Sequence, residues 1–213
     1  QGEIWIGSVE NNSGTGDPFL LVDPGGDDHW RIAPSREALP PEGLRAVRGW
    51  IDLAGDDRWD GGVGAAGGAL FSVAAGVDAG GNDSHRSGRL GGGAAVLGSS
   101  TWLDLGGADR YEADGASQGM AAFGIAALRD VGQEADSYRA QGSAQAAALA
   151  GGVGVLQDSG GDDHYVLTHA SAGGGQARAR GELPSVGGGI ALLIDEGGND
   201  RYEAEALAQA SCD

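Results

Sequence analysis

The sequence contains no lysine, and this absence makes its charge one-sided. All 13 basic residues are arginine, they are outnumbered by 31 acidic residues, and the formal net charge is −18. A surface of this sign repels phosphate backbones and anionic membranes, and it concentrates cations. We therefore expect no nucleic-acid partner, and cations are the first ligands to consider.

Other scarce features exclude further classes of protein. The single cysteine, Cys212, cannot form an internal disulfide framework, and its place near the end of the sequence argues against a catalytic thiol. No apolar run reaches the roughly 18 residues that a membrane-spanning helix needs, and no amino-terminal segment has the pattern of a signal peptide, so we expect no membrane insertion. Because Gln1 stands in place of an initiator Met and Asp213 falls within a repeat, we expect the sequence to be part of a longer chain.

Glycine, in contrast, is abundant, with 43 of 213 residues, and much of it belongs to a repeat. The motif Asp-x-Gly-Gly-x-Asp-x-aromatic recurs seven times with a period of about 27 residues. Its first aspartates, the first aspartate column, are Asp23, Asp52, Asp78, Asp104, Asp130, Asp158 and Asp195. Its second aspartates, the second aspartate column, are Asp28, Asp57, Asp83, Asp109, Asp136, Asp163 and Asp200.

Two more columns accompany the motif. Two residues before each first aspartate stands a residue that is mostly large and apolar, as an inward-facing strand position requires: Leu21, Trp50, Gly76, Trp102, Leu128, Leu156 and Leu193. This column is predicted to be core. Downstream of the aromatic stand Gln118, Gln145, Gln176 and Gln209. In stacked coils these amides would form a hydrogen-bonded ladder.

The segments between the motifs are small and apolar, as in residues 119–128 and 151–156. A helix is the alternative interpretation, but each glycine would cost it about 1 kcal/mol relative to alanine. The period is too short for a propeller blade of roughly 40 residues. We therefore predict an all-β fold, a parallel β-solenoid (β-helix) of about seven coils, in which equivalent residues stack about 4.8 Å apart.

This array is expected to form one repeat domain over residues 1–213. Residues 1–49 are irregular and contain Pro34, Pro40 and Pro41, so they are predicted to form irregular coils or a cap. Residues 50–213 hold the regular repeats, with an insertion near residues 174–185. Open coil ends could pair edge to edge, so end-to-end self-association is a further expectation.

Stacked coils would bring the carboxylates of each aspartate column close together. At an effective dielectric constant near 20, neighbours about 4.8 Å apart repel by roughly 3–4 kcal/mol before screening by salt. Bound cations would remove this cost, and so would backbone N–H groups held in Asx-turns, with Arg58, Arg110 and Arg201 supplying positive charge. A salt-adapted source is a third explanation of the acidic composition.

The motif resembles the calcium-binding repeats of the RTX family. The likeness lies in Gly25-Gly26-Asp27-Asp28, Gly80-Gly81-Asn82-Asp83, Gly106-Gly107-Ala108-Asp109 and Gly197-Gly198-Asn199-Asp200. The resemblance implies Ca²⁺ bound between coils, and Ca²⁺ takes six to eight oxygen ligands from carboxylates and carbonyls. We therefore predict Ca²⁺ as the cofactor and all fourteen aspartates of the two columns as its ligands.

Other residues invite functional interpretations that we weigh against structural ones. The motif aromatics could form a platform for sugars, but packing in the core is favoured. Ser117 formally matches a Gly-x-Ser-x-Gly elbow, yet it falls in a repeat column that holds Ala144 in the next coil. The four histidines lack zinc-ligand spacing and are predicted to be exposed loop residues: His29, His85, His164 and His169.

The sequence thus predicts no catalytic residue. The predicted function is a calcium-stabilised extracellular or cell-surface module with a structural, adhesive or filament-type role, and its partner is a polysaccharide or another protein. The alternative is a β-helical polysaccharide lyase or glycoside hydrolase. Its site would lie at the insertion, near Arg178, Arg180 and Glu182 and close to His164 and His169.

Overall fold

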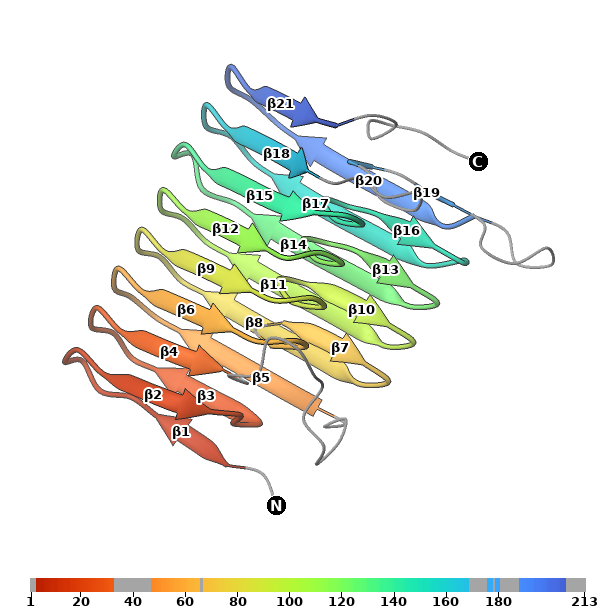
Figure 1. Ribbon diagram of the computed structural model, residues 1–213. Coiled ribbons are helices and arrows are strands. Elements are labelled where there is room, and N and C mark those ends of the chain that lie inside the picture. The colour runs from red at the N-terminus through yellow and green to blue at the C-terminus, as the bar shows by residue number, and fades with distance from the viewer. Residues whose placement is uncertain are drawn as a thin grey trace.

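The protein is a parallel β-solenoid whose coils stack from one end of the chain to the other (Figure 1). The computed structural model describes residues 3–32, 47–65, 67–168, 176–177, 179–180 and 188–205. These residues form three parallel sheets and no helix, which confirms the predicted fold class and the choice of strands over helices. Among them, no helix could span a membrane.

Two of the sheets have eight strands each. Sheet 1 consists of β1 (Ile4–Ile6), β3 (Leu20–Asp23), β5 (Val47–Asp52), β8 (Val73–Asp78), β11 (Ser99–Asp104), β14 (Ile125–Asp130), β17 (Val153–Asp158) and β20 (Ile190–Asp195). Sheet 2 consists of β2 (Ser13–Gly16), β4 (His29–Ile32), β6 (Arg58–Gly61), β9 (Ser84–Ser87), β12 (Arg110–Ala113), β15 (Ser137–Gln141), β18 (His164–Thr168) and β21 (Arg201–Ala204).

The third sheet is smaller. Sheet 3 consists of β7 (Gly68–Leu70), β10 (Ala94–Val96), β13 (Ala121–Ala122), β16 (Ala148–Leu149) and β19 (Ala179–Arg180). Five coils therefore have a strand in all three sheets, and three more have described strands in sheets 1 and 2 only. The count differs slightly from the predicted seven because the β1–β2 coil carries no copy of the motif.

The strand register follows the repeat columns. Asp52 pairs with Asp78, and Asp78 with Asp104, so the first aspartate column runs straight along one edge of sheet 1. The apolar column two residues earlier is also in register and points inward. Its exception, Gly76, is explained by packing, because a Cβ atom there would lie 2.4 Å from the ring of Trp102. The predicted core column is confirmed, with most of its members fully buried.

The motif aromatics also face the core. Trp30, Trp59, Tyr111, Tyr138 and Tyr165 are at most 5% exposed, and Tyr202 is 40% exposed. The rings of Tyr111, Tyr138, Tyr165 and Tyr202 stack nearly parallel, with successive centroids 4.9, 4.8 and 4.7 Å apart. The core interpretation is therefore correct, and no sugar platform forms from these five buried rings.

The glutamine column is buried, but most of its hydrogen bonds go to the backbone. The Nε2 of Gln118 donates to the carbonyls of Tyr111 and Arg139, and that of Gln145 to the carbonyls of Tyr138 and Val166. Only Gln176 continues the predicted amide ladder, with its Nε2 2.8 Å from the Oε1 of Gln145. Gln209 lies outside the described residues.

Two outer faces of the solenoid differ in character. Outward positions of sheet 2 carry charged pairs, such as Arg58 with Asp60 and Arg201 with Glu203. Outward positions of sheet 1 carry aliphatic side chains, such as Ile125 and Ile190, each 57% exposed. Because strand residues alternate between faces, both patterns follow directly from the sequence once the inward columns are fixed.

Several predicted features fall on residues that the structure does not describe. They include the proline-rich segment around Pro34, Pro40 and Pro41, and most of the insertion at 174–185 with Arg178 and Glu182. His169, Cys212 and Asp213 also lie outside the described residues. The described residues of the predicted irregular amino-terminal region form β1 to β4 and the start of β5, which pair in the same sheets as the later coils.

Candidate metal centre

The turns between sheets 1 and 2 gather the aspartates of both columns along one corner of the solenoid (Figure 1). Each first-column aspartate is the last residue of a sheet 1 strand, and each second-column aspartate directly precedes a sheet 2 strand. The second glycine of the motif makes this turn possible. At Gly81 (φ 154°) a Cβ atom would lie 1.6 Å from the carbonyl oxygen of Gly55 in the preceding coil.

One oxygen of each first-column aspartate closes its own turn. The Oδ1 atom accepts a hydrogen bond from the backbone N–H two residues later, at 3.3 Å from Gly80 in Asp78 and 2.9 Å from Gly132 in Asp130. This is an Asx-turn, in which a carboxylate takes the place of a backbone carbonyl. The predicted turn-forming role is therefore present in the first column.

One oxygen of each second-column aspartate joins neighbouring coils. The N–H of Asp57 donates to the Oδ1 of Asp83 at 2.6 Å, and the N–H of Asp83 donates to the Oδ1 of Asp109 at 2.7 Å. The same bond repeats from Asp28 through Asp200. Each side chain thus reaches one coil back, so the column acts as a continuous set of links between coils.

The remaining oxygens are the exceptional feature of this corner. Six second-column Oδ2 atoms are buried and have no hydrogen-bond partner: those of Asp28, Asp57, Asp83, Asp109, Asp136 and Asp163. In the first column, the Oδ2 atoms of Asp52 and Asp78 are also without one. A buried polar atom without a partner costs about 1–3 kcal/mol, and more if it is charged. These carboxyl groups therefore require a proton or a cation.

Burial shifts the pKa of these groups strongly upward. Desolvation, together with the neighbouring carboxyl groups of Asp57 and Asp78, raises the pKa of Asp52 to about 9. Desolvation and the charges of Asp83 and Asp104 raise that of Asp78 to about 9. Burial likewise raises the pKa of Asp109 to about 8 and that of Asp136 to about 9. Without a bound cation, these carboxyl groups hold protons at neutral pH.

Four groups of side chains come close enough to share one ion. In each, one ligand atom per residue lies within 4.8 Å of the others: Asp78, Asp83, His85 and Asp104; Asp104, Asp109 and Asp130; Asp136, Asp158 and Asp163; and Asp163, Asp195 and Asp200. Ten of the fourteen predicted ligands are thus brought together. In the described residues, Asp23, Asp28, Asp52 and Asp57 belong to no such group.

The predicted neutralising arginines lie elsewhere. Arg58 pairs with Asp60 at 2.9 Å, Arg110 with Glu112, and Arg201 with Glu203. All three point outward from sheet 2, because each directly precedes an inward-facing aromatic position. The prediction that they balance the aspartate columns is therefore wrong.

The histidines also correct the sequence analysis. His85 is only 8% exposed and lies beside the aspartates, whereas it was expected in an exposed loop. His29 and His164 lie on strands of sheet 2 and contact Asp60 and Glu203. The signal for His85 was present in the sequence, since it occupies the aromatic position of the third motif copy and that position faces inward.

Ser117 shows no sign of catalytic activation. Its side chain is fully buried and its hydroxyl has no hydrogen-bond partner, so no base holds it as a nucleophile. A serine here fits the small, buried column that also holds Ala144, with which it pairs.

Comparison with protein-family models, with curated proteins and with solved structures finds no match to this chain.

Proposed function

We propose that this chain is a non-catalytic structural module that pairs with a second copy of itself through the outer face of sheet 1. We further propose that Ca²⁺ in the aspartate columns stabilises its coils. The main support for this pairing is the amino-acid composition of that outer face.

The outer face of sheet 1 is almost free of charge. Of 22 outward positions in its eight strands, 17 are aliphatic, one is charged (Arg129), and none is Asp or Glu. The most exposed members are Ile4, Ile6, Val47, Ile125 and Ile190, each more than half exposed. In a chain of net charge −18, the acidic residues are thus kept off this one face.

The area of this face matches that of a protein interface. Eight strands spaced about 4.8 Å apart, with outward residues spread over five positions, cover about 600–750 Å². Two copies would therefore bury on the order of 1,200–1,500 Å², within the range of a specific interface. The largest apolar patch on an ordinary monomer is smaller or comparable, at about 300–600 Å².

A second copy suits this face better than other occupants. Flat sheets pack face to face about 10 Å apart with interdigitated side chains, so a sheet face can complement itself. Stacking of sugars would need exposed Trp or Tyr rings, and the 22 outward positions contain neither. Anionic lipid surfaces would be repelled by the net charge of −18.

A matched pair of substitutions in one coil tests the pairing. Val155 lies on the outer face of sheet 1 and Val166 on the outer face of sheet 2, and both are half-buried. By sedimentation equilibrium, the wild type and V166R are expected to be dimers and V155R a monomer. A monomeric wild type, or a V155R variant that still forms dimers, would reject the proposed interface; assembly on polysaccharide alone would point to the other predicted partner class.

The case for calcium rests on the buried aspartate Oδ2 atoms that have no hydrogen-bond partner. Carboxylates are the ligands that this hard cation prefers, and each cluster supplies three of them in one small volume. The arrangement of ion sites between coils is also what the likeness to RTX repeats implies. Weak sites of this kind fill in millimolar Ca²⁺ outside cells, so we place the module in the extracellular space or at the cell surface.

Thermal unfolding tests the role of calcium. The unfolding midpoint is compared in excess EDTA and in added Ca²⁺ at constant ionic strength, with Mg²⁺ as the matched control. Each site filled at 100 times its dissociation constant adds about 2.7 kcal/mol to the free energy of unfolding, so several sites would raise the midpoint strongly. An unchanged midpoint would leave the aspartates as turn-formers and links between coils alone.

The enzymatic alternative gains no support from the described residues. The clustered carboxylates repeat from coil to coil, whereas a catalytic site is a local departure from symmetry. Screening for cleavage of acidic polysaccharides remains its direct test.

A further inference from the structure

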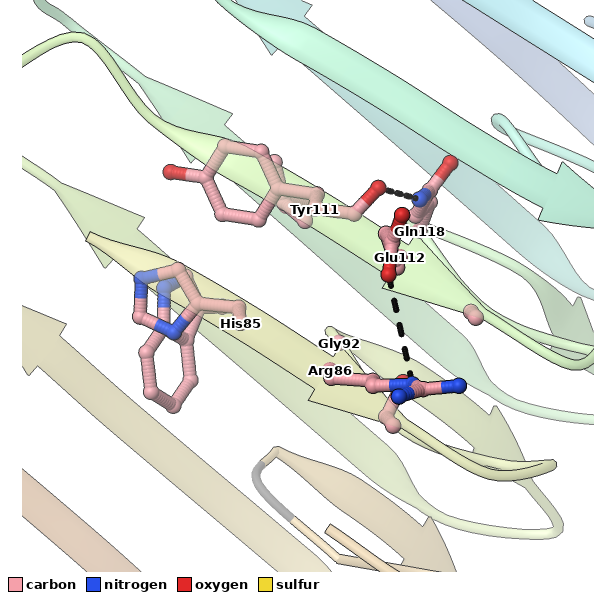
Figure 2. A pocket seen from close by; sticks show the side chains of 10 residues that line it. His85, Arg86, Gly92, Tyr111, Glu112 and Gln118 are labelled. Atoms are coloured by element: carbon pink, nitrogen blue, oxygen red, sulfur yellow. Dashed lines mark hydrogen bonds and ion pairs between the residues drawn. The ribbon is translucent and has the colours of Figure 1, made fainter. Parts of the chain in front are cut away.

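His85 breaks the symmetry of the aromatic column. It lies on β9, where neighbouring strands place Trp59 and Tyr111, and it stacks on the Tyr111 ring with centroids 5.0 Å apart. Figure 2 shows His85 and Tyr111 extending to the same side of adjacent strands. The imidazole therefore stands between an indole and a phenol, and it is the one ring of the described aromatic column with a nitrogen that can bind a metal ion.

The imidazole has no hydrogen-bond partner. Its side chain is 9% exposed, and neither Nδ1 nor Nε2 makes a hydrogen bond. The Nε2 atom lies 3.7 Å from the Oδ2 of Asp78 and 3.7 Å from the Oδ2 of Asp104. Hydrogen bonds between nitrogen and oxygen are about 2.7–3.2 Å long, so these contacts are too long for direct bonds.

The spacing instead suits a shared ion. One atom each of Asp78, Asp83, His85 and Asp104 lie within 4.8 Å of one another, and the Oδ2 atoms of Asp78 and Asp83 lack partners. In a tetrahedral zinc site with bonds of about 2.0–2.1 Å, ligand atoms lie roughly 3.3–3.4 Å apart. The two 3.7 Å distances are within a small adjustment of that geometry.

We propose that His85, Asp78, Asp83 and Asp104 form a Zn²⁺ site, distinct from the all-oxygen sites of the other coils. Imidazole suits Zn²⁺ and other borderline metals, whereas Ca²⁺ takes oxygen ligands. The inference deepens the proposed cation binding by the aspartate columns at one coil. It assigns that coil a different metal and a nitrogen ligand.

Cobalt provides a direct probe, because tetrahedral Co²⁺ in a zinc site absorbs visible light and reports its ligands. Metal-free wild-type protein is titrated with Co²⁺ and then with Zn²⁺ or Ca²⁺. We expect one Co²⁺ per chain with tetrahedral bands, which Zn²⁺ displaces and millimolar Ca²⁺ does not. His164→Gln, at an exposed histidine beside Glu203, is expected to keep the bands.

Two variants decide whether His85 is the ligand. His85→Tyr introduces the phenol that the following coil carries at Tyr111, and it is expected to abolish the cobalt bands. Tyr138→His places an imidazole between Asp130 and Asp158, and is expected to add a second site, which keeps the test valid if His85→Tyr fails to fold.

The results separate this inference from calcium binding. Absent bands in the wild type, or bands that persist in His85→Tyr, would overturn the zinc site and leave His85 as a histidine between carboxylates. The calcium-dependent rise in unfolding midpoint is measured in the same two proteins. If Ca²⁺ raises the midpoint but no cobalt bands are seen, the proposed stabilisation by calcium stands and only the zinc site is rejected.

Discussion

The carboxyl corner of the solenoid differs between the coils that hold Tyr111 and Tyr138 and the coils that hold Trp59 and His85. From β11 to β17, Tyr111 and Tyr138 donate hydrogen bonds to the Oδ2 atoms of Asp104, Asp130 and Asp158, at 2.6–2.9 Å for the shorter bonds. From β5 to β9, Trp59 and His85 make no such bond, and Asp52 and Asp78 keep orphaned Oδ2 atoms.

The difference shows what the aromatic position does for the first aspartate column. The phenol of Tyr111 places its hydroxyl between the carboxyl groups of two successive coils and keeps its ring stacked on that of Tyr138. An indole stacks less regularly, with Trp30 and Trp59 centroids 6.5 Å apart and tilted by 39°. Burial raises the pKa of Asp130 to about 6, but those of Asp52 and Asp78 to about 9. Within the first column, the need for a proton or a cation is therefore greater at Asp52 and Asp78 than at Asp130.

The largest expected effect is on pH dependence. The raised pKa values mean that the folded, metal-free protein binds more protons than the unfolded chain, whose Asp pKa is about 3.9. This contribution to stability is complete below about pH 4, where the unfolded chain is also protonated, and is lost as pH rises from there through the folded-state pKa values of about 6 to 9. Unfolding midpoints in EDTA should fall across that range, and Ca²⁺ should restore them; a flat profile in EDTA would contradict the buried protons.

The second largest expected effect is the loss of stability when one hydrogen bond between coils is removed. Asp136→Ala removes the oxygen that accepts the N–H of Asp109 at 2.6 Å, in the middle of the tyrosine coils. We expect the free energy of unfolding to fall by about 2–4 kcal/mol, because a buried donor loses its partner and a cavity remains. Asp136→Asn keeps the acceptor oxygen and serves as the control. Urea unfolding at pH 5 measures the stability of both variants. Equal losses in the two would contradict a stabilising hydrogen bond from the N–H of Asp109 to this side chain.

A smaller effect is expected from a substitution that makes the Tyr138 coil resemble the Trp59 coil, in which the aspartate receives no hydrogen bond from the ring. Tyr138→Phe removes the hydroxyl that donates to Asp158 at 2.6 Å and keeps the stacked ring. The expected loss is about 1.5–3 kcal/mol in EDTA, with a larger gain from Ca²⁺ than in the wild type. Tyr202→Phe, at a position 40% exposed, should lose less. If Ca²⁺ raised the free energy of unfolding equally in the wild type and in Tyr138→Phe, the phenol hydrogen bond would not lower the need of these carboxyl groups for a cation.

The smallest expected effect is a stabilisation. In EDTA, His85→Tyr should extend the tyrosine stack by one coil and give Asp78 a donor. We expect a gain of about 1 kcal/mol in the free energy of unfolding. Differential scanning calorimetry of the metal-free variant checks the sign. A loss would show that the imidazole, rather than the missing phenol, stabilises this coil.

Much of the fold could be predicted from the repeat alone. The spacing of the motif gave the solenoid, and the alternation around each first aspartate gave the inward column of Leu21, Trp50 and Leu128. Stacked coils place identical residues in identical surroundings, so a column in the sequence becomes a column in space. The Asx-turns at the first aspartates were predicted on the same basis.

The electrostatic details could not be predicted in this way. The side chains of Arg58 and Arg110 follow the pleat of sheet 2 outward, and this direction depends on the adjacent aromatics facing inward, which the motif spacing alone does not fix. The burial of His85 follows from the inward column that it occupies, whereas its residue type alone predicts an exposed position. The apolar outer face of sheet 1 required the sheet boundaries, since alternation predicts a face but not whether another layer covers it.

The hydrogen bonds between successive coils have a consequence for the gene. Each coil of the regular region bonds its neighbours through the same columns, so the junction formed by removing one coil would resemble the junctions already present. Duplication or deletion of a segment encoding one full period of about 26 residues would therefore change the length of the array by about 4.8 Å and preserve every column. An insertion or deletion of one codon within a strand would reverse inward and outward side chains beyond it.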